Sequence, residues 1–98
     1  EAYNMAVTRV NNRILVTEDN DTITNFSGCI ENIVVIAGTT TPSIQIKDTD
    51  TSGAVLWESG TMADNARLND QVDLRVWKEQ TLHIDLAGTG TKLYLYHD

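Results

Sequence analysis

The chain has 98 residues, 41% of them hydrophobic and 21% charged; this length supports one domain with its own core and leaves no room for a second. Seven Lys and Arg against fourteen Asp and Glu give a formal net charge of −7, and the cations are scattered along the chain. Binding to phosphate backbones or anionic membranes needs clustered cations, so the composition argues against nucleic acid and membrane as partners.

Apolar residues recur with a period of two, the period of β-strands, through most of the chain. The predicted strands, in chain order, lie at residues 5–7, 14–16, 30–36, 44–46, 54–57, 72–76, 82–86 and 93–96. Turn-forming residues separate them at 11–12, 19–21, 38–42, 48–53 and 88–90. Seven or eight short strands with this spacing predict an all-β antiparallel sandwich, Ig-like or jelly-roll-like, over residues 1–98. Residues 62–68 are expected to form a loop, and residues 1–10 an N-terminal arm or an edge strand.

Cys29 is the only cysteine, so no intramolecular disulfide can form, which favours assembly in a reducing compartment. It precedes the apolar run 33–36, where a buried and inert thiol is expected. His83 lies on the polar side of its strand beside Asp85, and His97 lies near the end. The histidines have no zinc-site spacing, and no Gly-x-Ser-x-Gly elbow occurs, so we expect no enzyme. No apolar stretch reaches the 18 residues expected of a transmembrane helix.

The segment DTDTSG at residues 48–53 matches the first six positions of an EF-hand calcium loop. Asp48, Asp50 and Ser52 would supply the alternate oxygen ligands. Position twelve, however, is Ser59 instead of Glu, and strands instead of helices are expected on both sides. A hairpin that uses Asp, Ser and Gly for their turn chemistry is therefore the preferred interpretation, with weak calcium binding as the alternative. No cofactor is expected.

The aromatic residues Trp57, Trp77, Tyr94 and Tyr96 have two interpretations. Alternation places Trp77 on an outer strand face, and places Tyr94 and Tyr96 opposite the apolar side of their strand. Because aromatic side chains dominate cores and subunit interfaces, packing there is preferred, and a platform that stacks on sugars is the alternative. The predicted interface residues are Tyr3, Met5, Trp77, Tyr94 and Tyr96.

Five segments of the second half follow one another in an order known from a protein family. They are IQIKD at 44–48, VLWESG at 55–60, VDLRV at 72–76, LHIDLAGTG at 82–90 and LYLY at 93–96. In this order they resemble the small β-sandwich virion proteins of tailed bacteriophages, which include capsid decoration (cement) proteins, head fibres and neck or tail accessory proteins. The resemblance covers residues 44–96 and brings no catalytic or ligand-binding residue with it.

The resemblance implies a non-enzymatic structural protein of a bacteriophage virion, a capsid decoration protein that stabilises the shell through repeated symmetric contacts. The implied partners are further copies of the chain, with a trimer favoured, and the major capsid protein or other virion proteins. The implied location is the virion, assembled in the cytoplasm of the bacterial host. In this interpretation residues 1–10 become ordered on a neighbour. The alternative function is a carbohydrate-binding or adhesive β-sandwich module.

Overall fold

The computed structural model describes residues 7–98, except for the side chains of Asn25, Trp77, Lys78 and Glu79. It contains seven strands: β1 (Val7–Val10), β2 (Arg13–Val16), β3 (Asp21–Ile36), β4 (Thr39–Asp48), β5 (Val55–Glu58), β6 (Arg67–Thr89) and β7 (Lys92–His97). No helix in this part of the chain is long and apolar enough to cross a membrane. Tyr3, Met5 and most of the strand expected at residues 5–7 lie outside the described residues.

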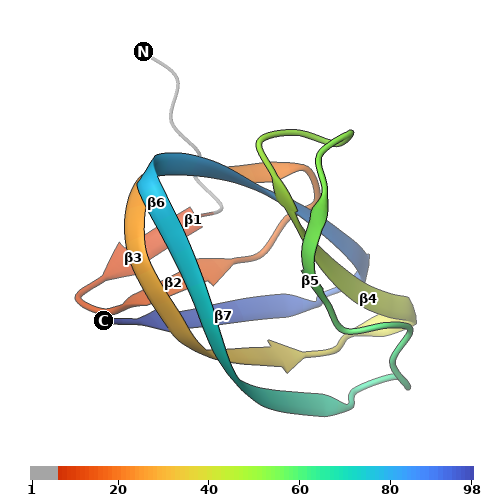
Figure 1. The fold of residues 1–98 in the computed structure, drawn as a ribbon. Coiled ribbons are helices and arrows are strands. Elements are labelled where there is room, and N and C mark those ends of the chain that lie inside the picture. The colour runs from red at the N-terminus through yellow and green to blue at the C-terminus, as the bar shows by residue number, and fades with distance from the viewer. Residues whose placement is uncertain (1–6) are drawn as a thin grey trace.

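All paired strands run antiparallel, in the order β1-β2-β7-β3-β6-β4-β5 (Figure 1). The 16-residue β3 and the 23-residue β6 pair twice, residues 21–23 with 82–84 and residues 28–36 with 67–76, with register shifts between the two stretches. Both strands curve at these irregularities and so belong to two facing layers. The first layer holds β1, β2, β7, the end of β3 and the start of β6. The second layer holds the start of β3, the end of β6, β4 and β5.

The core lies between the two layers, and its buried residues alternate with more exposed ones along β2, β7 and most of the other strands. One row crosses the first layer through Ile14, Leu95 and Ile33, which pair in register and are all 0% exposed. The second layer faces it with fully buried residues that include Ile44 and Ile84. One apolar cluster therefore joins both layers, as a sandwich requires. The predicted all-β antiparallel sandwich is confirmed.

Two details of the strand prediction are wrong. The runs expected as separate strands at 72–76 and 82–86 are parts of the single strand β6, because Gln80 between them still pairs with Phe26 of β3. Strand β3 also starts at Asp21, well before the expected residue 30. Gly28 lies in the curved stretch with φ of 140°, where a Cβ atom would come within 2.8 Å of Asp98 Oδ1. Glycine therefore suits this position both in backbone conformation and in space.

The turn predicted at residues 11–12 is confirmed. Asn11 has φ of 53°, a conformation that asparagine tolerates, and it joins β1 to β2 as a tight hairpin. Residues Val7–Val10 consequently form an edge strand at one end of the sheet order. The expected loop runs from residue 59 to residue 66, and β6 begins at Arg67.

Candidate functional site

The outer side of the first layer carries both tyrosines of β7. Tyr94 pairs with Leu15 of β2 and Val34 of β3, and directly opposed residues of antiparallel strands point to the same side of the sheet. Tyr96 is in the next outward row, with Arg13 and Asn32. We call this surface the tyrosine face; its residues are Val10, Arg13, Leu15, Asn32, Val34, Ile36, Arg67, Asn69, Gln71, Lys92, Tyr94 and Tyr96.

The tyrosine face is more apolar than the outer side of a sandwich usually is. Such a side is expected to carry polar residues at alternate positions. Here Leu15, Val34 and Ile36 point outward and are only partly covered, while Val10 is 48% and Tyr96 38% exposed. Contiguous apolar surface of this kind marks a site of interaction.

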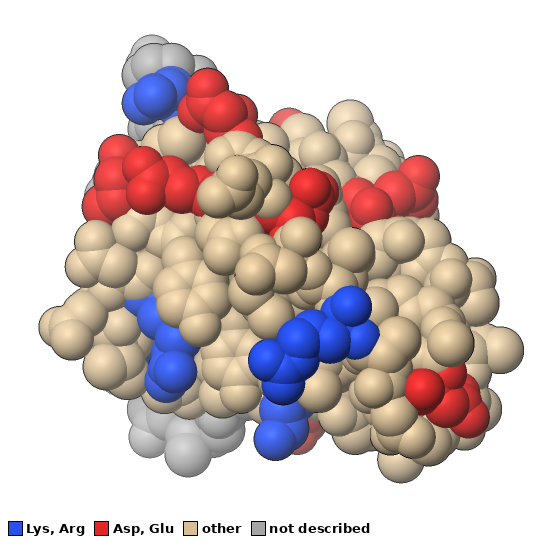
Figure 2. All heavy atoms as spheres, turned by 90° about the horizontal axis from the view of Figure 1, so that it is seen from below, with Lys and Arg blue, Asp and Glu red and all other residues tan. Residues whose placement is uncertain are grey.

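The tyrosine face carries three cations, of which Arg13 lies in the row of Tyr96 and the other two lie together at one end. The guanidinium carbon of Arg13 lies 5.5 Å from the centroid of the Tyr94 ring, a cation–π arrangement. Lys92 and Arg67 are both exposed and lie in one outward row, on either side of Ile36. Figure 2 views the molecule from below Figure 1, the side of β7, the end of β3 and the start of β6, and shows several Lys and Arg side chains in the middle and lower part of that view.

Acidic residues lie at the opposite end of the same outer surface, around Cys29. The thiol of Cys29 donates a hydrogen bond to Asp73 Oδ1 at 2.9 Å, and its backbone N–H donates to Asp98 Oδ1 at 2.9 Å. The tyrosine face therefore has a basic end and an acidic end with apolar residues between them.

The thiol of Cys29 is buried, as the sequence predicts. The hydrogen bond to Asp73, then burial, raise the pKa of Cys29 above its usual value, because each disfavours the thiolate. A thiol with a raised pKa is a poor nucleophile at neutral pH. The thiol joins β3 to β6 through its hydrogen bond to Asp73.

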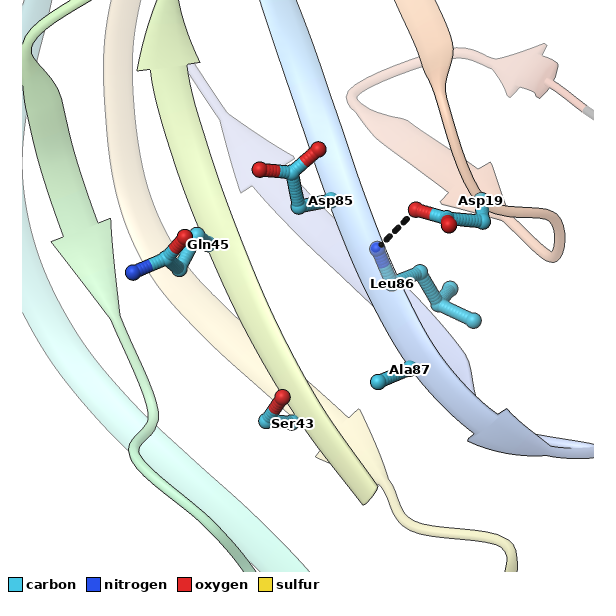
Figure 3. A pocket seen from close by; sticks show the side chains of 6 residues that line it. All are labelled: Asp19, Ser43, Gln45, Asp85, Leu86 and Ala87. Carbon is cyan, nitrogen blue, oxygen red and sulfur yellow. Dashed lines mark hydrogen bonds between the residues drawn. The ribbon is translucent and has the colours of Figure 1, made fainter. Parts of the chain in front are cut away.

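Two shallow hollows lie side by side on the outer surface of the second layer. One, of about 140 Å³, is lined by Asp19, Ser43, Gln45, Asp85, Leu86 and Ala87, and the other, of about 160 Å³, by Ser43, Ile44, Gln45, Glu58, Gly60 and Thr61. In Figure 3 the carboxylate of Asp19 reaches across to β6, where it accepts a hydrogen bond from the Leu86 backbone N–H at 2.8 Å. Pockets for organic ligands measure roughly 300–1,000 Å³ and are mostly apolar, so these hollows suit a few water molecules instead.

A polar cluster next to these hollows contains the histidine that the sequence places beside Asp85. Lys47 Nζ lies 2.6 Å from Asp85 Oδ2, and His83 Nε2 lies 3.1 Å from Asp85 Oδ1. The hydrogen bond from Lys47 lowers the pKa of Asp85 below its usual value, against a smaller opposing effect of burial. Among the residues that the structure describes, no group of three His, Cys, Asp or Glu side chains could hold a metal ion.

The candidate calcium loop forms the hairpin between β4 and β5. Asp50 Oδ1 accepts a hydrogen bond from the Ser52 backbone N–H at 2.9 Å, and Asp48 Oδ1 accepts hydrogen bonds from Gln80 Nε2 and Thr49 Oγ1. A Cβ atom at Gly53 would lie 1.6 Å from the Asp48 carbonyl oxygen, so the turn requires glycine. These contacts are the turn chemistry of the preferred interpretation, and calcium binding stays a prediction.

The four aromatic residues do not form one platform. Trp57 pairs with the fully buried Ile46, so its side chain points inward, and its Nε1–H donates to Asp70 Oδ2 at 2.8 Å across the two layers. Of the predicted interface residues, Tyr94 and Tyr96 lie together on the tyrosine face. The side chain of Trp77, like Tyr3 and Met5, lies outside the described part of the chain.

Sequence reasoning missed most of the tyrosine face. Val34 and Ile36 belong to a run that is apolar at consecutive positions, and this run indicates a central strand, which β3 is. The same run also signals that both sides of β3 are apolar. No sequence pattern indicates that the cations Arg13, Arg67 and Lys92 lie on one surface, because they are far apart in the chain and are brought together only by strand pairing.

Comparison with known proteins gives no family. No protein-family model matches the sequence, and no curated protein matches it. Among solved structures, a similar chain is CsCBM6-3 from Clostridium stercorarium in complex with cellobiose, with 12% sequence identity and a TM-score of 0.48 over 98% of this chain and 85% of that chain. The likeness is too distant to transfer a ligand or a site to this chain.

Proposed function

We propose that the chain is a non-enzymatic structural protein that acts by docking its tyrosine face on another protein surface, as a capsid decoration component of a phage virion. The observation that carries the docking function is the partly exposed apolar centre around Tyr94 and Tyr96 on an outer sheet surface. The resemblance of residues 44–96 to virion proteins supports the particle as the place where docking happens.

The chemistry of the tyrosine face favours a protein partner. Tyrosine and arginine are enriched in protein interfaces, where they supply large contact areas with polar tips. The Arg13 guanidinium lies over the Tyr94 ring, so that ring is less open to a sugar that would stack on it. The hollows on the second layer are lined by short polar side chains without an aromatic residue. The flat, tyrosine-bearing sheet surface is therefore better suited to a second flat surface than to a single sugar chain.

Decoration of a shell does not need a strong individual contact. Specific protein interfaces bury about 800 Å² per partner, and smaller ones are weak or transient. On a symmetric particle the same weak contact recurs many times, and linked contacts raise the overall affinity by about 10²–10⁴. A small, rigid sandwich with one interactive surface is sufficient for this passive role.

The test uses particles of the phage whose genome encodes the chain. We expect mass spectrometry to detect the chain in purified particles, and recombinant chain to cosediment with particles that lack its gene. Absence of the chain from purified particles would overturn the virion role. Tyr96→Ser should weaken cosedimentation by about tenfold or more, since central aromatic residues dominate interface energies.

Two valines provide a matched control for this test. Val10, on the tyrosine face, is 48% exposed, and Val55, on the second layer, is 46% exposed. Val10→Ser should weaken particle binding by about three- to fivefold through lost apolar burial. Val55→Ser should leave it unchanged. Equal effects of the two substitutions would show that the tyrosine face is not the docking surface.

A carbohydrate-binding module is the second candidate, favoured by one observation. Tyr96 is exposed and shares its outward row with the exposed side-chain amide of Gln71, which can hydrogen-bond hydroxyl groups. A panel of neutral oligosaccharides, titrated while NMR shifts of Tyr94 and Tyr96 are recorded, tests this function. Saturable shifts at both tyrosines, lost in Tyr96→Ser, would replace the protein partner by a sugar.

A further inference from the structure

The charges on the tyrosine face reverse sign along the strands. On β7 the outward positions in order are Lys92, Tyr94 and Tyr96, and the exposed Asp98 is the next position in this alternation, with its carboxylate at the Cys29 backbone N–H. Two tyrosines therefore lie in the middle of a line that has a cation at one end and a carboxylate at the other. The outermost residues are about 20 Å apart, since a strand rises about 3.3 Å per residue.

Strand β6 repeats the same pattern two strands away. Its outward positions are Arg67, Asn69, Gln71 and Asp73, and the first of these shares an outward row with Lys92. The acidic end also holds Arg75, close to Cys29, and the exposed Glu31 at a register shift of β3. At this end Asp73, Asp98 and Glu31 outnumber Arg75, so its charge is opposite to that of Lys92 and Arg67. Arg13 lies between the two ends, in the row of Tyr96.

We infer that the tyrosine face pairs with the tyrosine face of a second copy of this chain, about a two-fold axis that lies between the faces and crosses the strands. This inference rests on the proposed function, because it names the protein surface on which the tyrosine face docks: the same face of a neighbouring copy on the particle. Rotation about such an axis places each strand over the same strand of the second copy, running in the opposite direction. Lys92 then lies over Asp98 of the second copy, and Arg67 over Asp73 of the second copy.

The centre of the pair is formed by the tyrosines. The same rotation exchanges the rows of Tyr94 and Tyr96, so each Tyr94 lies over Tyr96 of the second copy. The apolar side chains of Leu15 and Val34 flank Tyr94 in this centre and are removed from water by the second sheet. Sheets packed face to face lie about 10 Å apart, which leaves room for one interdigitated layer of such side chains.

The charge pattern selects a second copy over other partners. In an isologous interface each patch meets its own image, so a surface with two oppositely charged ends complements itself when one copy is reversed. A partner surface of uniform sign would be attracted to one end and repelled by the other. The chain carries a net charge of −7, so the reversed copy is attracted by this local pattern and not by overall charge.

The size of the face sets the expected affinity. Four strands about 4.8 Å apart and six residues long give a footprint of roughly 20 by 20 Å. That is about half the area per partner of a standard specific interface, so we expect a weak, reversible contact with a dissociation constant of about 100 µM. A two-fold contact closes at two copies, in contrast to the trimer favoured by the resemblance.

The test is sedimentation equilibrium of the full chain with three charge variants. We expect a reversible dimer for the native chain. Lys92→Glu and Asp98→Lys should each raise the dissociation constant about tenfold, because each substitution changes both Lys92–Asp98 pairs of the symmetric dimer. The double variant K92E/D98K should restore the native constant to within about threefold. Asp64→Lys, on an exposed loop outside the face, is the matched control and should change nothing.

Thermal unfolding of each variant verifies folding, since Asp98 also accepts the Cys29 backbone N–H. If Asp98→Lys does not fold, the pair Arg67→Glu and Asp73→Lys takes its place in the same design. A monomer at about 500 µM, a trimer, or a dimer without rescue in the double variant would overturn the inference. Particle binding that persists in a strictly monomeric chain would overturn only the self-pairing, whereas absence from particles would overturn the proposed function.

Discussion

Replacing Trp57 by phenylalanine tests whether this residue connects the two layers of the sandwich. The Trp57 Nε1–H donates to Asp70 Oδ2 at 2.8 Å, from β5 in the second layer to the start of β6 in the first. The ring is half-buried and packs on the apolar cluster. Phenylalanine keeps most of the ring contact and removes the donor.

A hydrogen bond to a charged acceptor contributes about 1.5–3 kcal/mol when buried, and the partial exposure of this pair reduces the expected loss to about 1–2 kcal/mol. For a domain of this size, that loss lowers the melting temperature by about 5–15 °C. Urea unfolding followed by circular dichroism measures the free energy of unfolding without relying on tryptophan fluorescence, which the substitution changes.

A double-mutant cycle isolates the interaction itself. Trp57→Phe, Asp70→Ala and the combined variant should show a coupling energy of about 1 kcal/mol, whereas Trp57→Phe combined with Asp64→Ala should be additive. A coupling energy near zero would refute the interlayer role of the Trp57–Asp70 pair. The contribution of Trp57 to stability would then come from its packing on the apolar cluster alone.

Three further substitutions have expected outcomes. Asp85→Asn should lower the urea midpoint at pH 7 and reduce its fall as the pH decreases. Lys47 lowers the pKa of Asp85 in the folded state, so the carboxylate stabilises the fold above about pH 4 and this contribution is lost at lower pH. Asp73→Asn should speed alkylation of Cys29 by iodoacetamide at pH 8, because the hydrogen bond to the Asp73 carboxylate is the main cause of the raised thiol pKa and an amide accepts it more weakly; an unchanged rate would contradict this cause. Gly53→Ala should destabilise the chain by about 2 kcal/mol or more in thermal unfolding, because its Cβ overlaps a backbone carbonyl; a native melting temperature would show that the hairpin has another conformation.

The sequence by itself determined the strand content and the inward residues. Alternation in the last strand assigns Leu93 and Leu95 to the core, and both are 0% exposed. The asparagine pair at residues 11–12 likewise located a hairpin. These features are local, because side-chain direction alternates with every residue and a tight turn needs residues that tolerate its backbone angles.

The tertiary structure decided where strands curve and which residues share a surface. Residues 77–81 contain no turn-forming residue. The pairing of Gln80 with Phe26 shows that β6 continues through them, and the register shifts against β3 show where the strand curves from one layer to the other. Arg13, Arg67 and Lys92 meet on one face because β2, β7, β3 and β6 lie side by side in an order unlike their order in the chain. Pairing between distant segments depends on the whole core, so a local pattern contains neither the tyrosine face nor the charges at its two ends.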